Sequence, residues 1–199
     1  MAAPPAVEDD GELGRPTPRR LIVAMAGASG ARYTLGLLAA LRDLRIESHL
    51  VTCACSRSIV RAETGLTPKL LRSRAYGWYH ERNQAAAISS GSFLTLGMVI
   101  VPCTSRSLAA LVTGVADNLV QRAADVTMKE GRRLVVAMAE RETSPIGLEN
   151  LDRAEQAGIR VIQLEGSPTA QRVRSVTNEL LGCFGIEPVE PISALEARP

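Results

Sequence analysis

Short apolar runs recur along the chain and alternate with stretches of helical periodicity. The apolar runs cover residues 21–26, 48–52, 97–101, 133–138 and 159–163, and the helical patterns cover 30–43, 55–63, 106–129, 147–157 and 169–184. Apolar runs without polar alternation are typical of strands that are buried on both faces. Regular alternation of such strands with helices predicts an α/β fold in which helices cover both faces of a doubly wound parallel sheet.

The two ends of the chain differ from this pattern. Residues 1–18 are rich in Pro, Ala, Glu and Asp without periodicity, which predicts a disordered leader, and residues 187–199 contain three prolines, which predicts an extended tail. A single domain is therefore expected over residues 19–186. Within it, Ser29 is expected to cap the first helix, Gly158 to end the fourth, and Ser167-Pro168 to start the last.

Composition narrows the class of protein further. The 199 residues are 46% hydrophobic and 22% charged with a net charge of +2, as is ordinary for a soluble globular domain. Acidic and basic residues are interspersed, so the charge pattern favours neither a nucleic-acid partner nor a membrane surface. We find no apolar run of the roughly 18 residues that span a bilayer and no signal-peptide pattern, and we therefore expect a cytoplasmic protein.

Cysteine and histidine counts exclude several kinds of site. Four cysteines are too few for a disulfide scaffold, and we expect all four to be reduced. Only two histidines are present, which excludes a His-rich metal site and leaves little for a Ser-His-Asp hydrolase. No metal site is predicted.

The first strand-to-helix junction is the strongest local signal for ligand binding. The run 21–26 breaks into Gly27-Ala28-Ser29-Gly30 and then into a helical pattern. Free backbone N–H groups and the helix dipole at such a junction favour an anion such as a phosphate. The alternative is that the glycines serve only close packing of the strand against the helix.

A second junction of the same kind follows the run 97–101, where the sequence reads Cys103-Thr104-Ser105-Arg106-Ser107. Thr104 and Ser105 are either helix caps or ligand contacts. Because both junctions lie at the carboxyl edge of one parallel sheet, they favour a ligand crevice. The second strand ends in Val51-Thr52-Cys53 without a carboxylate for a ribose, which disfavours NAD and suits FMN.

Seven short motifs between residues 27 and 143 form a distinctive set. They are Gly27-Ala-Ser-Gly-Ala31, Ile88-Ser-Ser-Gly-Ser-Phe93, Thr95-Leu-Gly-Met98, Pro102-Cys103, Gln121-Arg-Ala-Ala-Asp-Val126, Lys129-Glu130 and Arg141-Glu-Thr143. Together they resemble the flavin prenyltransferases related to UbiX, within the superfamily of homo-oligomeric flavin-containing cysteine decarboxylases. The resemblance covers about residues 20–158 and implies a Rossmann-like, flavodoxin-type core, bound FMN, and assembly of identical subunits into trimers or a dodecamer.

The resemblance also assigns roles to particular positions. The residues that it implies for FMN binding are Gly27, Ala28, Ser29, Cys53, Thr104, Ser105, Arg106, Ser107 and Arg141. Those that it implies for proton transfer and phosphate binding are Ser29, Glu63, Arg122, Lys129 and Glu142. The set is chemically coherent, because Arg and Lys neutralise a phosphate leaving group and a carboxylate acts as acid or base. The alternative interpretation is that Arg122 and Lys129 are surface cations on one helical face and that Glu142 is a carboxylate at a helix start.

The C-terminal part departs from the family pattern. Residues 158–168 form a shorter connection without the tyrosine that binds prenyl phosphate in the family, and Glu179 stands where the family has an arginine. Charge-assisted hydrogen bonds contribute about 1.5–3 kcal/mol each, so these changes should weaken binding of a dianionic phosphate.

We therefore expect that FMN serves here as a redox cofactor for oxidative decarboxylation of the C-terminal cysteine of a precursor peptide. The product would be an aminoenethiol, as in the linaridin-type (cypemycin) decarboxylases of peptide natural-product maturation. Against this expectation, Ala87 stands where related decarboxylases carry a histidine. One alternative is a flavin prenyltransferase that alkylates reduced FMN with dimethylallyl phosphate, and the other is a noncatalytic FMN-binding partner subunit of a decarboxylase.

Overall fold

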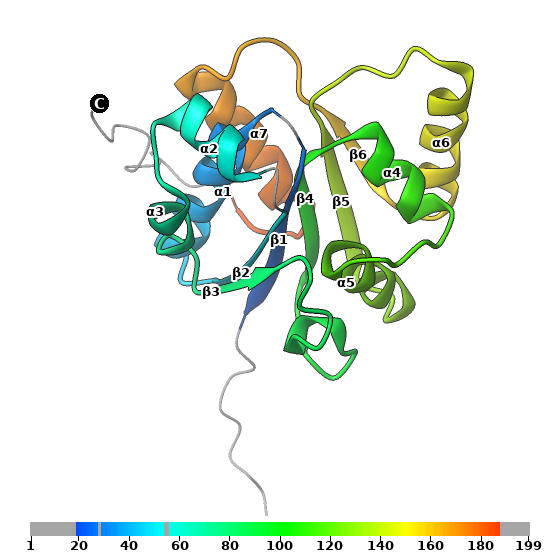
Figure 1. The fold of residues 1–199 in the computed structure, drawn as a ribbon, viewed down its shortest axis with the longest axis horizontal. Helices are drawn as coiled ribbons and strands as arrows, with labels where there is room; N and C mark the ends of the chain where they lie inside the picture. Colours follow the sequence, from blue (N-terminus) through cyan, green and yellow to red (C-terminus); the bar gives the residue numbers. More distant parts are fainter. Residues whose placement is uncertain (1–18, 28, 54–55, 188–199) are drawn as a thin grey trace, which may run out of the picture.

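Six parallel strands form one sheet in the order β3-β2-β1-β4-β5-β6 (Figure 1). The computed structural model describes residues 19–27, 29–53 and 56–187, and the statements below refer to these residues. The predicted leader and nearly all of the predicted tail lie outside them. The strands are β1 (Arg20–Ala26), β2 (Glu47–Thr52), β3 (Gly77–His80), β4 (Gly97–Cys103), β5 (Arg133–Met138) and β6 (Arg160–Gln163).

Helices cover both faces of this sheet. Helices α1, α2, α3 and α7 lie on one side, and α4, α5 and α6 lie on the other (Figure 1). Their bounds are α1 (Ala31–Asp43), α2 (Ser56–Thr64), α3 (Pro68–Arg72), α4 (Ser105–Val112), α5 (Leu119–Lys129), α6 (Pro145–Gln156) and α7 (Ala170–Gly182), with a short 3₁₀ turn, η1, at Ala87–Ser89. Among the described residues, none of these helices is both long and apolar enough to cross a membrane.

Alternate residues of the central strand face two separate cores. Leu21, Val23 and Met25 of β1 are fully buried in the cluster formed with α1 and α7. Ile22 and Ala24, between them, join the cluster formed with α4, α5 and α6. This two-sided burial explains the uninterrupted apolar run in the sequence, because successive side chains of a strand point to opposite faces.

The predicted fold class and the five predicted strands are confirmed, and three details are corrected. The sixth strand, β3, was not predicted, because it is only four half-buried residues at the sheet edge. The predicted helix over 106–129 is two helices: α4 ends before Gly114, which has φ of +73°, and the Asn118 side chain caps α5. The last helix begins at Ala170 with Thr169 as its cap, because the Thr169 hydroxyl accepts the free Arg172 N–H.

The chain direction across the sheet reverses between β1 and β4. From β1 the chain moves outward to β2 and β3, and it then returns to β4 on the other side of β1. The loops that follow β1 and β4 therefore separate at the carboxyl edge and leave room between them. Open α/β sheets bind their ligands at such a position.

Candidate functional site

A cavity of about 470 Å³ lies at this reversal point, between the loops that follow β1 and β4. Five of the predicted cofactor-binding residues line it: Gly27, Cys53, Thr104, Arg106 and Ser107. Polar residues that the sequence analysis did not single out for the site complete one side, namely Glu81, Asp117, Asn118 and Gln121. Apolar side chains form the rest of the wall, among them Ile100, Leu111, Val115 and Val120.

Two of these additional residues were missed for the same reason. Asp117 and Asn118 stand in the break between α4 and α5, which the sequence analysis treated as one continuous helix. The signal that could have found them is Gly114 followed by Asn118, a helix stop and then a cap before a new apolar pattern. Gln121 is part of a quoted family motif but was given no role.

Two hydroxyl groups fix the start of α4 against the end of β1. Thr104 Oγ1 accepts a hydrogen bond from Ser107 N at 3.2 Å and thereby caps α4. Thr104 Oγ1 and Ser107 Oγ each donate to the Ala26 carbonyl oxygen at 3.2 Å. The capping role considered for Thr104 is confirmed, and it places both hydroxyls in the cavity wall.

Gly27 allows the loop after β1 to lie directly on β4. A Cβ atom built at Gly27 would meet the Pro102 side chain at 2.7 Å, which is closer than real contacts allow. The close approach at this glycine is to strand β4, and not the packing of strand against helix that the sequence analysis considered. Ala28, the next predicted contact, lies outside the described residues.

The N-terminus of α1 is capped by a carboxylate from another helix. Gly30 N lies 2.9 and 3.0 Å from the two carboxylate oxygens of Glu63, and Ala31 N lies 2.7 Å from one of them. The prediction that Ser29 caps α1 is wrong: the N-cap is Gly30, with φ of +105°, and Ser29 is exposed. Glu63 places its negative charge where the helix dipole favours an anion.

Glu142 lies where α4 and α6 begin. Ser105 Oγ donates to Glu142 Oε1, and a Cβ atom at Gly147 would overlap the Glu142 carboxylate. The cap of α6 is Ser144, whose hydroxyl accepts from Gly147 N at 3.0 Å, so Glu142 is not the capping residue. Arg141 beside it is exposed, on the loop that follows β5.

Arg122 and Lys129 lie on the outer face of α5 and do not line the cavity. Both pair with Asp125, whose Oδ2 lies 3.3 Å from Arg122 Nη1 and 2.8 Å from Lys129 Nζ. Their side chains are 44% and 67% exposed. Lys129 ends α5, whereas Asn118, which lines the cavity, caps the start of that helix. One chain thus does not bring these cations together with Ser29, Glu63 and Glu142.

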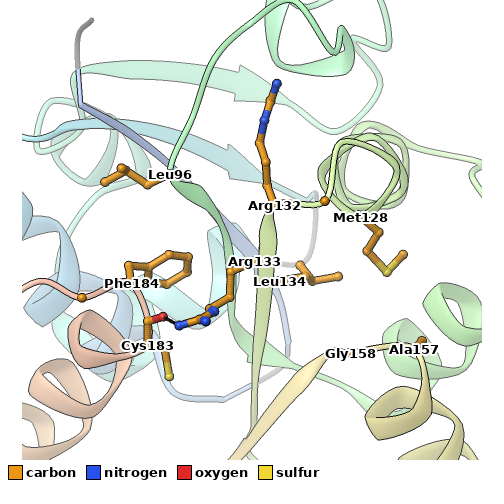
Figure 2. Close-up of a pocket in the computed structure, with 11 residues that line it drawn as sticks. Leu96, Met128, Arg132, Arg133, Leu134, Ala157, Gly158, Cys183 and Phe184 are labelled. Carbon is orange, nitrogen blue, oxygen red and sulfur yellow. Dashed lines mark hydrogen bonds between the residues drawn. The ribbon is translucent and has the colours of Figure 1, made fainter. Parts of the chain in front are cut away.

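A larger cavity, of about 780 Å³, lies at the opposite edge of the sheet, where β4 and β5 begin (Figure 2). Its wall includes Leu96, Met128 and Phe184, and Figure 2 shows Arg133 directed toward the Cys183 carbonyl oxygen, to which it donates. None of the predicted site residues lines it. Because parallel α/β sheets bind ligands at their carboxyl ends, the smaller cavity is the candidate site.

The cysteines differ in state. Cys103 and Cys183 are free thiols, and burial raises the pKa of Cys103 to about 12. Cys53 is disulfide-bonded, so the expectation that all four cysteines are reduced is wrong. A count of four cysteines argues against a fold held together by many disulfides, but it does not exclude one disulfide bond. The Cys53 sulfur lies 3.1 Å from Ser56 Oγ, at the entrance to α2.

The sequence matches the Flavoprotein family over residues 12–185. It is 44% identical over 144 residues to the "Probable UbiX-like flavin prenyltransferase" of Streptomyces sp. (strain D7), covering 72% of each protein. It is 41% identical over 165 residues to the flavin prenyltransferase UbiX of Deinococcus radiodurans, covering 83% of this chain and 84% of the relative.

Solved structures show the same fold. A UbiX protein in complex with FMN and dimethylallyl pyrophosphate superposes with a TM-score of 0.81 at 34% identity, covering 85% of this chain and 94% of that one. A dodecameric FMN-dependent UbiX-like decarboxylase from Escherichia coli O157:H7 gives 0.79 at 37% identity, covering 84% and 95%. Cypemycin decarboxylase gives 0.62 at 16% identity, covering 83% and 92%, and shares the fold alone. Because the Flavoprotein family model matches most of its length, this chain belongs to the Flavoprotein family.

Proposed function

We propose that this protein is a flavin prenyltransferase, which joins a prenyl group from a prenyl phosphate to reduced FMN. The observation that carries the proposal is the identity of 41–44% with flavin prenyltransferases over most of both chains. The decarboxylase that acts on cypemycin is only 16% identical, so it supports the fold and not the reaction. The comparisons thus favour prenyl transfer, the alternative from the sequence, over peptidyl-cysteine decarboxylation.

The cavity at the carboxyl edge has the properties that FMN needs. Its volume lies within the range of about 300–1,000 Å³ that small-molecule sites occupy. Its apolar side chains suit a flat ring system, and its hydroxyl and amide groups suit a ribityl chain and phosphate. We assign Gly27, Cys53, Thr104, Arg106 and Ser107, which line the cavity, as its contacts within one chain, and we keep Ser29, Ser105 and Arg141 as further candidate contacts.

Among the described residues that line the cavity, Arg106 is the one cation, and we assign it to FMN, so the phosphate of the prenyl donor requires further cations. Transfer breaks the bond between the prenyl carbon and the phosphate oxygen, and the departing phosphate carries the bonding electrons. We propose that Arg122 and Lys129 neutralise this charge from a neighbouring copy, since both are exposed on α5 and away from the chain's own cavity. The dodecameric relative supports such sharing between identical subunits.

The proton that leaves the flavin ring on bond formation requires a base. Glu142 is the carboxylate that we propose for this step, because Ser105 donates to it at the start of α4, beside the cavity. Ser29 and Glu63 are assigned to proton transfer near the start of α1, where the Glu63 carboxylate accepts hydrogen bonds from the Gly30 and Ala31 amides.

The C-terminal part that departs from the family pattern should weaken binding of the prenyl phosphate. Glu179 is an exposed residue of α7, and the loop from Leu164 to Thr169 contains no aromatic side chain. Loss of two charge-assisted contacts of about 1.5–3 kcal/mol each would raise the KM for the prenyl phosphate by at least about a hundredfold, compared with a family member that keeps both contacts. The chemistry at the flavin is retained.

The deciding experiment offers both substrate classes to the same anaerobic protein. The full chain is incubated with reduced FMN and dimethylallyl phosphate, or with oxidised FMN and peptides that end in cysteine, and products are identified by mass spectrometry. We expect a flavin that is heavier by one prenyl unit and no change in the peptides. The Glu142→Gln variant should bind FMN as the parent does and lose most of the transfer activity.

Other outcomes contradict the proposal. A peptide that loses carbon dioxide and two hydrogens, with bleaching of the flavin, would establish oxidative cysteine decarboxylation. FMN binding without turnover of either substrate class would identify a noncatalytic FMN-binding subunit.

A further inference from the structure

A basic pocket of about 410 Å³ lies at the amino edge of the sheet, far along the strands from the proposed flavin site. The end of α1 supplies Arg42, the turn that follows α1 supplies Arg45, and the segment after α3 supplies Arg74. Tyr76, whose side chain is 70% exposed, forms one side. The start of β2, at Ile46 and Glu47, closes the pocket between them.

The positive charge of this pocket is not balanced within the described residues. Arg42 has a distant partner in Asp43, at 3.6 Å. Glu47 is engaged with Arg20, at 2.8 Å between the guanidinium and the carboxylate. Arg45 and Arg74 have no ion pair in the part of the chain that the structure describes. The pocket therefore presents two free cations beside an exposed aromatic ring.

The matching negative charge is in the leader of the same chain. Residues 1–18 contain Glu8, Asp9, Asp10 and Glu12 and a single basic residue, Arg15. This is a local excess of acidic residues in a chain whose net charge is +2. Val7 and Leu13 border the acidic residues and could pack against an exposed aromatic ring such as that of Tyr76.

The leader also enters the fold beside the pocket. The Arg19 carbonyl oxygen accepts a hydrogen bond from Glu47 N at 2.9 Å, and Glu47 lines the pocket. Glu12 lies seven positions before Arg19, which at about 3.3–3.6 Å per residue allows a reach of about 25 Å. A short tether of this kind gives an effective concentration in the millimolar range, so weak contacts are sufficient for docking.

The other cavity at the amino edge is a poorer match for an acidic segment. Arg132 there donates to the carbonyl oxygens of Gly91 and Phe93 and lies 3.5 Å from the Glu130 carboxylate. Arg133 donates to the Cys183 carbonyl oxygen, as Figure 2 shows. Both guanidinium groups are therefore already engaged, whereas those of Arg45 and Arg74 are not.

We propose that the acidic segment of residues 8–12 docks on the pocket formed by Arg42, Arg45 and Arg74 of the same chain. The docked segment covers the amino edge beside β2 and pairs the unbalanced cations. Because exposed ion pairs are individually weak and are screened by salt, the docking is strong at low ionic strength and is lost at high ionic strength.

Hydrogen exchange measured by mass spectrometry on the full chain tests the proposal directly. At low salt, the amides of residues 7–13 should exchange about threefold to tenfold more slowly than an unstructured peptide of the same sequence, as expected for a mostly docked segment. The Arg45→Glu/Arg74→Glu variant should remove this protection. The matched control is Arg174→Glu, on the exposed face of α7, which should leave it unchanged.

A charge exchange makes the test specific. Adding Asp9→Arg/Asp10→Arg to the Arg45→Glu/Arg74→Glu variant should restore the protection. Random-coil exchange of the leader in the parent protein at low salt would overturn the proposal. So would protection that survives both Arg45→Glu/Arg74→Glu and high salt. The salt comparison uses the parent protein alone and stays decisive even where a variant folds poorly.

Discussion

His49 is a buried titratable side chain outside the proposed site. It is 5% exposed, and its Nδ1 atom lies 3.1 Å from the Tyr79 hydroxyl. Its Nε2 atom has no hydrogen-bond partner among the described residues and lies 3.7 Å from the Glu47 carboxylate. Burial lowers the pKa of His49, and this effect outweighs the opposing attraction of Glu47.

A pH dependence of stability follows from this lowered pKa. The folded state favours neutral His49. The contribution of His49 to the free energy of unfolding is therefore complete above its pKa in the unfolded state, about 6.5, and is lost as the pH falls through its lower pKa in the folded state. We predict that the His49→Gln variant loses less of its free energy of unfolding than the parent between pH 7.5 and pH 5.5. Urea denaturation at the two pH values measures this, and a parent-minus-variant difference that is independent of pH would contradict it.

At the same scale, local contacts could be predicted from the sequence and distant ones could not. Thr104 caps α4 through Ser107, three residues away, and the residue types alone favour that contact. Glu63 caps α1 from 33 residues away, a contact that depends on where α2 packs. The local rule therefore selected Ser29, and tertiary structure supplied a better acceptor.

At the scale of elements, the contact between α1 and α7 depends on Gly36. A Cβ atom at this position would lie 2.6 Å from Val173 Cγ1 and 3.0 Å from Thr177 Oγ1, both on α7. Val173 and Thr177 are fully buried, so neither side chain has room to move aside. Glycine within a helix lowers stability by about 0.8–1.0 kcal/mol relative to alanine. At this position, the absence of a side chain allows α1 and α7 to pack closely.

We predict that Gly36→Ala destabilises the protein by about 1–3 kcal/mol despite the better helix propensity of alanine, because overpacking outweighs it. The matched control is Gly182→Ala at the end of α7, where a Cβ atom would meet nothing within 4 Å. That variant should be neutral or more stable by up to about 1 kcal/mol. Unfolding in urea measures both changes, and equal stabilisation by the two substitutions would refute the packing argument.

Elements with a strong periodic signal were predictable, and those set by context were not. The run 133–138 coincides with β5, because both faces of that strand are buried. β3 has only four residues and lies at the sheet edge, so Trp78 and Tyr79 gave no apolar run that the sequence analysis could detect. The break between α4 and α5 is caused by Gly114 and by the Asn118 cap, within a stretch whose helical periodicity otherwise continues.

At the scale of the whole molecule, the candidate site is divided between two surfaces. Glu142 lies beside the cavity, whereas Lys129 is exposed at the far end of α5. α6, which packs against α4, also exposes Ile146 and Leu148, by 73% and 48% of their surfaces. Exposed apolar side chains beside an incomplete site favour an interface with a second copy.

Sharing of the site predicts complementation between two inactive variants. Glu142→Gln and Lys129→Ala should each lose most of the transfer activity as separate assemblies. When the two chains are co-expressed with different tags and mixed assemblies are purified, about a quarter of the sites combine an intact Glu142 with an intact Lys129. We therefore expect about a quarter of the parent activity in the mixture. The matched control combines Glu142→Gln with Ser29→Ala, two residues assigned to the same copy, and should recover nothing. A site contained within one chain would leave both mixtures inactive, because no subunit would then carry both intact residues.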